Sequence, residues 1–512
     1  MSSFSRRDFL KVLGAAAAMP LAGALLPGSA SSPASTGRAP NVLFVVFDTL
    51  SARHMSLYGY PRRTTPNIER FAGVSTVYHQ HWAGGNFTTP GTASLLTGAY
   101  PWSHRAIHFY GHTLPAFESR NLFASLFSWQ RDAYTHNNLA FGLLNQFRAH
   151  IENLTPPAAL CLYDDRLADG LFPKDYGVAF YGEERIRGSR TSLHTSLLFS
   201  LLSKAHYTLV SRRLQAKFAA QFPLGLPDNY NDQIFLLEDA IDWIITRCSG
   251  LSSPFLGYYH LLPPHEPYTP RADFVGRFAG ISPAAPDKPR HFFGGDTPPD
   301  EISAQRTHYD EYLAYVDAEF GRLYDALATA GRLEDTLIIF TSDHGQMFER
   351  GILGHITPVL YEPLLHIPLL IHFPGQTARQ DVHLSTSAVD VLPTLMNLAA
   401  QPIPDWMEGQ VLPGAAAQSA SYDASRPVFA LDAKENAKGA PLTVATLAVR
   451  QGEYKLIHYF GYAGLDERVE LYDLKNDPEE LRDLSALKPA LVSDLLQVIA
   501  ASQRPPYTPP SP

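Results

Sequence analysis

The sequence contains little cysteine: Cys161 and Cys248 are the two it has. A structural zinc site needs several closely spaced ligands, so two isolated cysteines exclude a cysteine zinc site. An exported protein with two cysteines can join them in one disulfide. Their spacing alone does not show whether they pair.

The sequence also lacks a long run of charge of one sign, and its net charge is −9. Nucleic acid binding needs a basic face, so we exclude nucleic acid as a partner. Hydrophobic residues make up 45% and charged residues 18%, which is typical of a globular protein. The 512 residues suffice for one large domain, or for a large and a small one.

The N-terminal apolar segment, VLGAAAAMPLAGALL at residues 12–26, is short for a membrane span. It follows the paired arginines of SRRDFLK and precedes a small-residue stretch, a pattern typical of a twin-arginine export signal. We interpret residues 1–30 as this signal and 31–40 as a linker. The predicted location is the periplasm, the cell surface or the medium, and the alternative is a lone membrane anchor. Because this route carries folded proteins, often with a cofactor loaded, it is a first indication of a metal.

Apolar segments that end in polar residues recur along the chain. They are NVLFVVFDTL at 41–50, PFLGYYHLLPPHEPY at 254–268, DTLIIFTSDHGQ at 335–346 and PLLIHF at 368–373. Such runs predict buried parallel strands. Segments 233–248 and 306–331 have helical periodicity, and Gly331 is expected to close the second. The alternation predicts an α/β fold with a mostly parallel sheet and helices on both faces.

The character of the chain changes after about residue 400. Short alternating segments followed by a helix at 487–502 predict a small antiparallel subdomain over 401–505, after a catalytic domain over 41–400. Residues 150–230 fit this organisation least well. Within them, the apolar and basic segment 192–222 predicts a core-facing helix pair, or else a contact with a membrane surface or lipid substrate.

Asp48 and Asp343 each follow an apolar strand, and His344 comes next to Asp343. Ligands bind at the carboxyl ends of strands in such sheets. Two carboxylates and an imidazole that meet there would form a divalent metal site. The sequence does not distinguish Ca²⁺, Mn²⁺ and Zn²⁺, and it leaves room for a second ion. The alternative is that each aspartate only caps a turn.

The segment GGNFTTPGTASLLTG, residues 84–98, has the form of a loop that runs into a helix. The backbone N–H groups of a helix start attract anions. A metal could deprotonate the Thr88 hydroxyl for attack on phosphorus or sulfur. Asn86 and Thr92 are expected to contact the substrate. Alternatively, Thr88 or Thr89 caps the helix.

Two histidines lie in loops near predicted strand ends, His265 in PPHEPY and His355 in GILGHITP. Either could donate to a substrate oxygen, protonate the leaving group or bind a second metal. A histidine among prolines could equally hydrogen-bond the loop backbone. His104, in YPWSHRA, is the weakest candidate.

These segments together, in this order, resemble the sulfatase family within the alkaline-phosphatase-like superfamily. Further matching segments are TTPNIERFA, YDEYLAYVDAEFGRL, AVDVLPTLMNLA and ELYDLKNDPEEL. The resemblance implies a central, mostly parallel sheet between helical layers and a small C-terminal antiparallel subdomain. It also implies one divalent metal held by Asp48, Asp343 and His344, with the nucleophile at Thr88.

The chain departs from the family pattern at the nucleophile loop. Sulfatases carry Cys or Ser in C/S-x-P-S-R and convert it to formylglycine, whereas this chain has Thr88-Thr89-Pro90-Gly91-Thr92. Threonine cannot give the aldehyde because its side-chain carbon bears a methyl group. The supporting arginine of the family is Thr92 here, and its double aspartate is Asp48-Thr49.

Other cations of the family pattern are missing as well. One lysine is absent from YTHNNLAFG, where His136 or Asn137 could serve, and His136 is expected to contact the substrate. Another lysine is absent near His355 and Thr357, and His366 stands at an arginine position. Each lost charge-assisted contact costs roughly 1.5–3 kcal/mol if it is not replaced. A phosphodiester, which carries less charge, therefore fits better than a dianion.

The sequence thus predicts an exported metal-dependent hydrolase of phosphate or sulfate esters, with phosphoesters favoured and Thr88 as the nucleophile. Its substrate would be a small molecule, a lipid or a glycan. A phospho-group transferase that modifies lipid or glycan is one alternative. A non-catalytic binding protein on the same fold is the other.

Overall fold

The computed structural model describes residues 39–164, 197–229, 233–283, 286–415, 422–437 and 439–502. Contacts group residues 37–512 into one compact unit. The predicted export signal lies outside the described residues, as does most of the predicted linker. Within the described ranges, no helix has both the length and the apolar character that a membrane crossing requires.

An eight-stranded sheet lies at the centre, in the order β12-β2-β11-β8-β1-β7-β3-β4. Of these, β11 runs against its neighbours β8 and β2, and the other pairs are parallel. The prediction of a mostly parallel sheet is confirmed. The strand bounds are β1 Asn41–Phe47, β2 Thr76–Trp82, β3 Gln130–Thr135, β4 Asn153–Leu154, β7 Phe255–Leu261, β8 Thr336–Thr341, β11 Leu369–His372 and β12 Gln380–Ser387.

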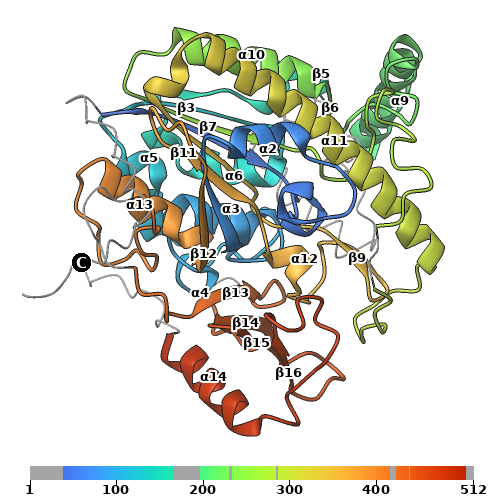
Figure 1. Ribbon diagram of the computed structural model, residues 1–512. Helices are drawn as coiled ribbons and strands as arrows, with labels where there is room; N and C mark the ends of the chain where they lie inside the picture. Colours follow the sequence, from blue (N-terminus) through green and yellow to red (C-terminus); the bar gives the residue numbers. More distant parts are fainter. Residues whose placement is uncertain are drawn as a thin grey trace, which may run out of the picture. The chain divides into compact units, whose positions relative to one another are not determined.

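Helices cover both faces of this sheet (Figure 1). Strand β1 is buried throughout, and its successive side chains enter two different cores. Leu43 and Phe47 pack in the core formed with α2 (Pro66–Ala72), α10 (Leu237–Gly250) and α11 (Pro299–Thr329). Phe44 and Val46 pack in the core formed with α3 (Thr88–Thr97), α6 (Asn138–Gln146) and α13 (Val391–Leu398). This two-sided burial explains why the strand reads as a continuous apolar run.

Several predicted helices differ in their bounds. Segment 233–248 begins with a short strand, β6 (Gln233–Phe235), which pairs with β5 (Cys161–Asp164), so the predicted helical start was wrong. The partner strand satisfies the backbone there, and α10 begins only at Leu237. Helix α11 begins earlier than predicted, with a proline at its first position. In segment 192–222 the described part forms one helix, α9 (Leu197–Phe218), and not the predicted pair. Cys161 and Cys248 do not form a disulfide with each other.

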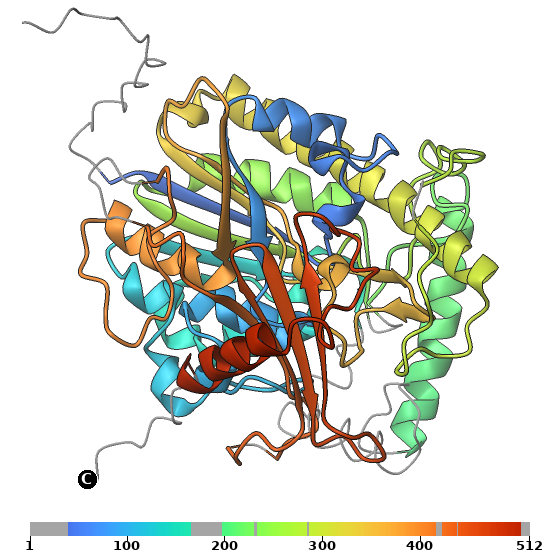
Figure 2. The same cartoon turned by 60° about the horizontal axis from the view of Figure 1, so that its bottom comes forward.

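The C-terminal part forms the predicted antiparallel sheet and helix. Strands β13 (Val428–Asp432), β14 (Ala445–Gln451), β15 (Tyr454–Phe460) and β16 (Arg468–Asp473) pair in that order. Helix α14 (Pro489–Ser502) packs on one face of this sheet (Figure 2). The opposite face buries Val428 and Ile457 against Trp82 of the central sheet.

Direct bonds tie the two sheets together. The backbone N–H of Leu431 in β13 donates to the carbonyl of Gly84, in the loop before α3, over 3.0 Å. Lys455 of β15 is fully buried and pairs with Glu362 at 3.0 Å and with Glu480 at 2.7 Å. Burial alone would raise the pKa of Glu362. The nearby Lys455 ammonium outweighs this effect, and the pKa falls to about 2.

We expect Lys455→Met to lower the free energy of unfolding by about 3–5 kcal/mol, because it leaves two buried carboxylates without their cation. Urea unfolding measured by circular dichroism would show the change. Lys475→Met is the matched control, since the pair of Lys475 with Glu453 is exposed and its loss should hardly move the midpoint. Equal effects of the two substitutions would contradict this role of Lys455.

Candidate active site

Four neighbouring parallel strands of the central sheet end at one edge, and each brings a polar side chain there. Asp48 follows β1, and Asp343 and His344 follow β8. His260 lies near the end of β7, and Asn137 comes just after β3. All of these side chains are buried. The carboxyl edge of a parallel sheet is the usual ligand site of such folds.

The three predicted metal ligands form a cluster, with one ligand atom from each of Asp48, Asp343 and His344 within 4.8 Å of the others. His344 Nε2 lies 3.5 Å from Asp48 Oδ1 and 3.4 Å from Asp343 Oδ2. His344 Nδ1 donates to the carbonyl of Gly345 over 3.0 Å. This bond fixes the tautomer, so that Nε2 offers a lone pair to the cluster.

The electrostatics of the cluster fit a bound cation. Asp48 Oδ1 is buried and has no hydrogen-bond partner among the described residues. Burial and the nearby Asp48 carboxylate raise the pKa of Asp343 to about 8. Burial opposes the ionisation of Asp48, but the nearby imidazoles of His260, His265 and His344 hold its pKa below its usual value. Two adjacent carboxylates of this kind are stabilised by a divalent ion.

Thr88 is the first residue of α3, and its hydroxyl faces this cluster. Thr88 Oγ1 lies 3.4 Å from His344 Nε2. The N-cap is Phe87 and α3 has no side-chain cap bond, so the alternative interpretation of Thr88 or Thr89 as a cap was wrong. A Cβ added to Gly91 would lie 2.3 Å from the Asp343 carbonyl oxygen. Glycine at this position therefore lets the helix pack directly against the loop that carries Asp343 and His344.

His136 and Asn137 were the two candidates to serve in place of the missing lysine in YTHNNLAFG. Of these, Asn137 lies at the cluster. Its Nδ2 donates to Asp48 Oδ2 and, over 3.2 Å, to Thr88 Oγ1. Its Oδ1 accepts from the N–H groups of Leu139 and Ala140 and so caps α6. The His136 ring stacks on Phe235 at 4.0 Å instead, and its two nitrogens have no hydrogen-bond partner among the described residues.

We expect Asn137→Ser to lower kcat by about 10²-fold, because serine keeps the helix cap but is too short to donate to Asp48 and Thr88. Thermal melting should change little. Asn137→Ala is the comparison variant and should lose a further ~1 kcal/mol of stability with its cap. A kcat for Asn137→Ser close to that of the parent would show that the two side-chain bonds do not support turnover.

The sequence reasoning missed His260. Its Nε2 lies 3.3 Å from Asp48 Oδ2 and 3.8 Å from Asp343 Oδ2, so it contacts both carboxylates. It lies within strand β7, whose other residues suggested only a buried strand. A histidine inside the apolar run FLGYYHL, one residue before its carboxyl end, was the available signal.

His265 and His355 lie together beside His344. Their ring centroids are 4.9 Å apart, and the rings of His344 and His355 are 4.6 Å apart. Burial lowers the pKa of His355 to about 3. Burial also opposes protonation of His265, but Glu266 and Asp48 raise its pKa. The prediction that both histidines adjoin the metal cluster agrees with this placement, and their chemical roles stay predictions.

Three other candidates have structural contacts. Asn86 Nδ2 donates to the backbone carbonyls of residues 355, 357 and 359 and so holds this loop. Thr92 Oγ1 lies 3.5 Å from Asp343 Oδ2, at the limit of a hydrogen bond. His104 bonds to the Ser94 hydroxyl and to the N–H of Ala106. Substrate contacts of Asn86, Thr92 and His136 remain predictions.

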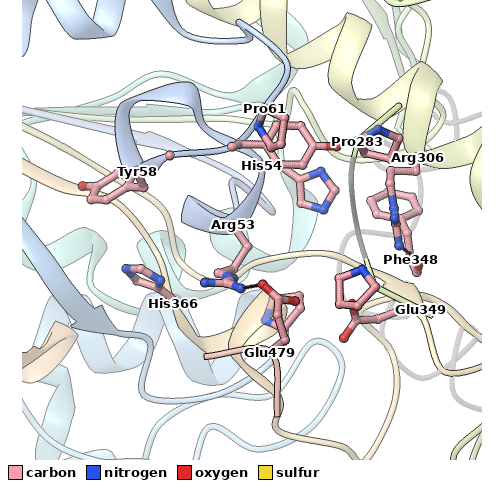
Figure 3. Close-up of a pocket in the computed structure, with 14 residues that line it drawn as sticks. Arg53, His54, Tyr58, Pro61, Pro283, Arg306, Phe348, Glu349, His366 and Glu479 are labelled. Atoms are coloured by element: carbon pink, nitrogen blue, oxygen red, sulfur yellow. Dashed lines mark hydrogen bonds and ion pairs between the residues drawn. The ribbon is translucent and has the colours of Figure 1, made fainter. Parts of the chain in front are cut away.

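A cavity of about 240 Å³ is lined by two arginines, Arg53 and Arg306. Both guanidinium groups already have partners within the protein. Figure 3 shows Arg53 and Glu479 pointing toward one another across it, joined as an ion pair. Arg306, which also lines it, donates to the carbonyl of Phe348. Within the described part of the chain, no lysine or arginine pairs with Asp48 or Asp343; their ion pairs are to histidines.

Comparison with known proteins identifies the family. Residues 40–401 match the sulfatase family. The chain belongs to the sulfatase family. Residues 357–498 also match the N-sulphoglucosamine sulphohydrolase C-terminal family, and residues 3–23 match the twin-arginine translocation signal. The protein is therefore a hydrolase of the sulfatase family that is exported by the twin-arginine route, as the sequence predicted.

The relatives of this sulfatase-family chain include enzymes of several kinds. A choline-sulfatase of Rhizobium meliloti (strain 1021) is 25% identical over 476 residues, which cover 88% of this chain and 83% of that protein. A phosphonate monoester hydrolase structure from Agrobacterium radiobacter has a TM-score of 0.63 at 20% identity, covering 90% of this chain and 96% of that one. A structure in complex with its substrate D-glucosamine-2-N,6-O-disulfate has a TM-score of 0.63 at 17% identity, covering 91% and 98%. The two structures share the fold.

Proposed function

We propose that this sulfatase-family protein is a metal-dependent phosphodiester hydrolase with Thr88 as its nucleophile. The observation that supports it best is the Thr88 hydroxyl, buried at a helix start and 3.4 Å from a histidine of the Asp48–Asp343–His344 cluster. A hydroxyl at this position can be aligned for attack on a phosphorus atom. The threonine replaces the family's formylglycine residue, so the chemistry differs from that of formylglycine sulfatases.

Asp48, Asp343 and His344 would hold the divalent ion. When bound, this ion supplies a positive charge that lowers the pKa of a nearby hydroxyl and polarises a phosphoryl oxygen. Asn137 orients Thr88 through its hydrogen bond to Oγ1. His260 contacts both metal-ligand carboxylates and helps to fix their positions.

The reaction would proceed in two steps. Thr88 Oγ1 forms a bond to phosphorus and loses its proton, and the bond between phosphorus and the leaving oxygen breaks. The released alcohol takes up a proton. Water then attacks the phosphorus bound to Thr88, the bond between phosphorus and Oγ1 breaks, and the phosphate monoester leaves while Oγ1 takes up a proton. His265 and His355 lie beside His344, next to the site of these steps.

The charge of the site favours a diester over a dianion. Asp48, Asp343 and Glu266 place three carboxylates near the reaction centre. The arginine that the family pattern implies is Thr92, whose hydroxyl lies beside Asp343. Each missing charge-assisted contact costs roughly 1.5–3 kcal/mol in binding a dianion, or about 10- to 150-fold in affinity.

A panel of aryl esters with one leaving group tests the proposal. Bis(p-nitrophenyl) phosphate, p-nitrophenyl phosphate and p-nitrophenyl sulfate all release p-nitrophenol, so their kcat/KM values compare the charge and the central atom of the transferred group directly. We expect the diester to be hydrolysed at least about 10-fold more efficiently than the dianionic phosphate monoester. A higher kcat/KM for the sulfate would refute the phosphodiester assignment. Turnover of none of the three would favour a binding protein on this fold.

A further inference from the structure

A second group of metal-ligating side chains adjoins the first. One ligand atom from each of His265, Glu266 and His355 lies within 4.8 Å of the others. His265 and Glu266 lie in the loop that follows β7, and His355 follows β10 (Ile352–Gly354). Because the His355 ring is 4.6 Å from that of His344, the two groups are neighbours within one site.

Hydrogen bonds around this second group hold both imidazoles as ligating histidines are held. His265 Nδ1 bonds to its neighbour's carbonyl oxygen, Glu266 O, at 2.7 Å. His355 Nδ1 bonds to Gln346 Oε1 at 2.7 Å. Carbonyl oxygens only accept, so each neutral ring carries its hydrogen on Nδ1 and a lone pair on Nε2. Metal-bound histidines commonly donate their other N–H to a carbonyl in this way.

Gln346 joins two members of the group. While its Oε1 accepts from His355, its Nε2 donates to Glu266 Oε2 over 2.7 Å and to the Tyr268 hydroxyl. All three bonds are satisfied by one orientation of the Gln346 amide. They fix the carboxylate and the imidazole relative to each other, which reduces the entropy that would be lost on binding an ion.

The charge balance of the site calls for more than one cation. Asp48, Asp343 and Glu266 carry three negative charges when ionised, and one divalent ion leaves the site at −1. An anionic substrate would add to this excess. The family pattern implies an arginine where Thr92 stands and a lysine near His355, so those fixed charges are missing here. A second divalent ion would replace them.

We propose that His265, Glu266 and His355 bind a second divalent cation next to the one held by Asp48, Asp343 and His344. Two imidazoles and one carboxylate are the ligand set of three-ligand catalytic zinc sites, and they suit Zn²⁺ better than Ca²⁺ or Mg²⁺. In two-metal sites one ion supports the attacking oxygen and the other the leaving oxygen. This role in turnover rests on the proposed function, whereas the binding of the ion does not.

The test measures how much Zn²⁺ the chelator-stripped full chain binds, by isothermal titration and by elemental analysis after gel filtration. We expect two equivalents for the parent and one for Glu266→Gln and for His355→Ala. His458→Ala is the matched control, because His458 is paired with Glu467 at the surface and its loss should leave two equivalents. Circular dichroism melting verifies folding, and Glu266→Gln, which keeps the side-chain shape, decides the outcome if His355→Ala does not fold.

One equivalent for the parent, or two for both site variants, would overturn the second site. Gln346→Ala gives a finer measurement, since loss of an outer hydrogen bond should weaken one of the two equivalents by about 10- to 100-fold and leave the other unchanged. Binding is read separately from ester hydrolysis. Two bound equivalents of Zn²⁺ without any hydrolysis would refute the proposed function and leave the second site standing. Ester hydrolysis with one bound equivalent would refute the second site and leave the proposed function standing.

Discussion

Thr88→Ala is expected to lower kcat for a phosphodiester by at least about 10³-fold, because it removes the proposed nucleophile and leaves only binding and electrostatic contributions. Thr88 is buried, and its hydroxyl bonds to Asn137 and lies near His344. The stability of the variant should change little, since the hydroxyl does not cap α3. Stopped assays with bis(p-nitrophenyl) phosphate would measure kcat, and thermal melting would verify the fold.

Two further variants show whether the loss is chemical. Thr88→Ser keeps a hydroxyl at the same position and should keep kcat within about 10-fold of the parent. Thr97→Val changes another buried threonine of α3, whose hydroxyl bonds to the carbonyl of Ala93, and should keep full activity. Trapping of a phosphorylated peptide containing Thr88 by mass spectrometry would identify the intermediate. An unchanged kcat for Thr88→Ala would exclude Thr88 as the nucleophile.

Removal of divalent metal is expected to abolish turnover, with a loss on the order of 10³-fold or more, since a metal supplies several kcal/mol of charge stabilisation. It should also lower stability, because two buried carboxylates, Asp48 and Asp343, are left facing one another. A free ion concentration of 100 times Kd adds about 2.7 kcal/mol to the free energy of unfolding. Chelation followed by stepwise return of Zn²⁺, Mn²⁺ or Ca²⁺, with activity and melting temperature recorded together, measures both effects.

Asp343→Asn tests metal dependence by changing the protein rather than the solution. The substitution removes one anionic ligand and keeps the side-chain size, so the metal-dependent part of the melting temperature should shrink and turnover should fall as it does on chelation. Asp325→Asn is the control, because Asp325 is exposed and pairs with Arg70 at the surface. Full turnover after exhaustive chelation would rule out metal dependence, as would an Asp343→Asn variant as active as Asp325→Asn.

The grouping of Asp48, Asp343 and His344 could be predicted from the sequence because parallel strands align their ends. Strand β1 lies between β7 and β8, with Val46 paired to both His260 and Thr341. Residues a short step beyond these positions must therefore meet, which places Asp48 near Asp343 and His344. The hydrophobic runs indicated the strands, and the polar residues after these runs are the side chains that meet.

Other parts of the site depended on side-chain direction, which a single sequence does not contain. Nothing in YTHNNLAFG distinguishes His136, which stacks on Phe235, from Asn137, which reaches Asp48. His260 lies within a run read as strand core, and Gln346 acts through bonds that form only after its loop folds beside Glu266. The short strand β6 was hidden for a similar reason, since its pairing partner lies about 70 residues earlier in the chain.

The bond between Leu431 and Gly84 has a consequence for how this protein can be divided. The loop that leads into Thr88 contacts strand β13, and a Cβ on Gly85 would come within 3.1 Å of the Leu431 carbonyl oxygen. The C-terminal sheet thus supports the start of α3, where the proposed nucleophile lies, although Asp48, Asp343 and His344 all follow strands of the central sheet. Recombination that exchanges this sheet between relatives should succeed only when the loop before α3 is exchanged with it, so these two distant stretches of chain are expected to be inherited together.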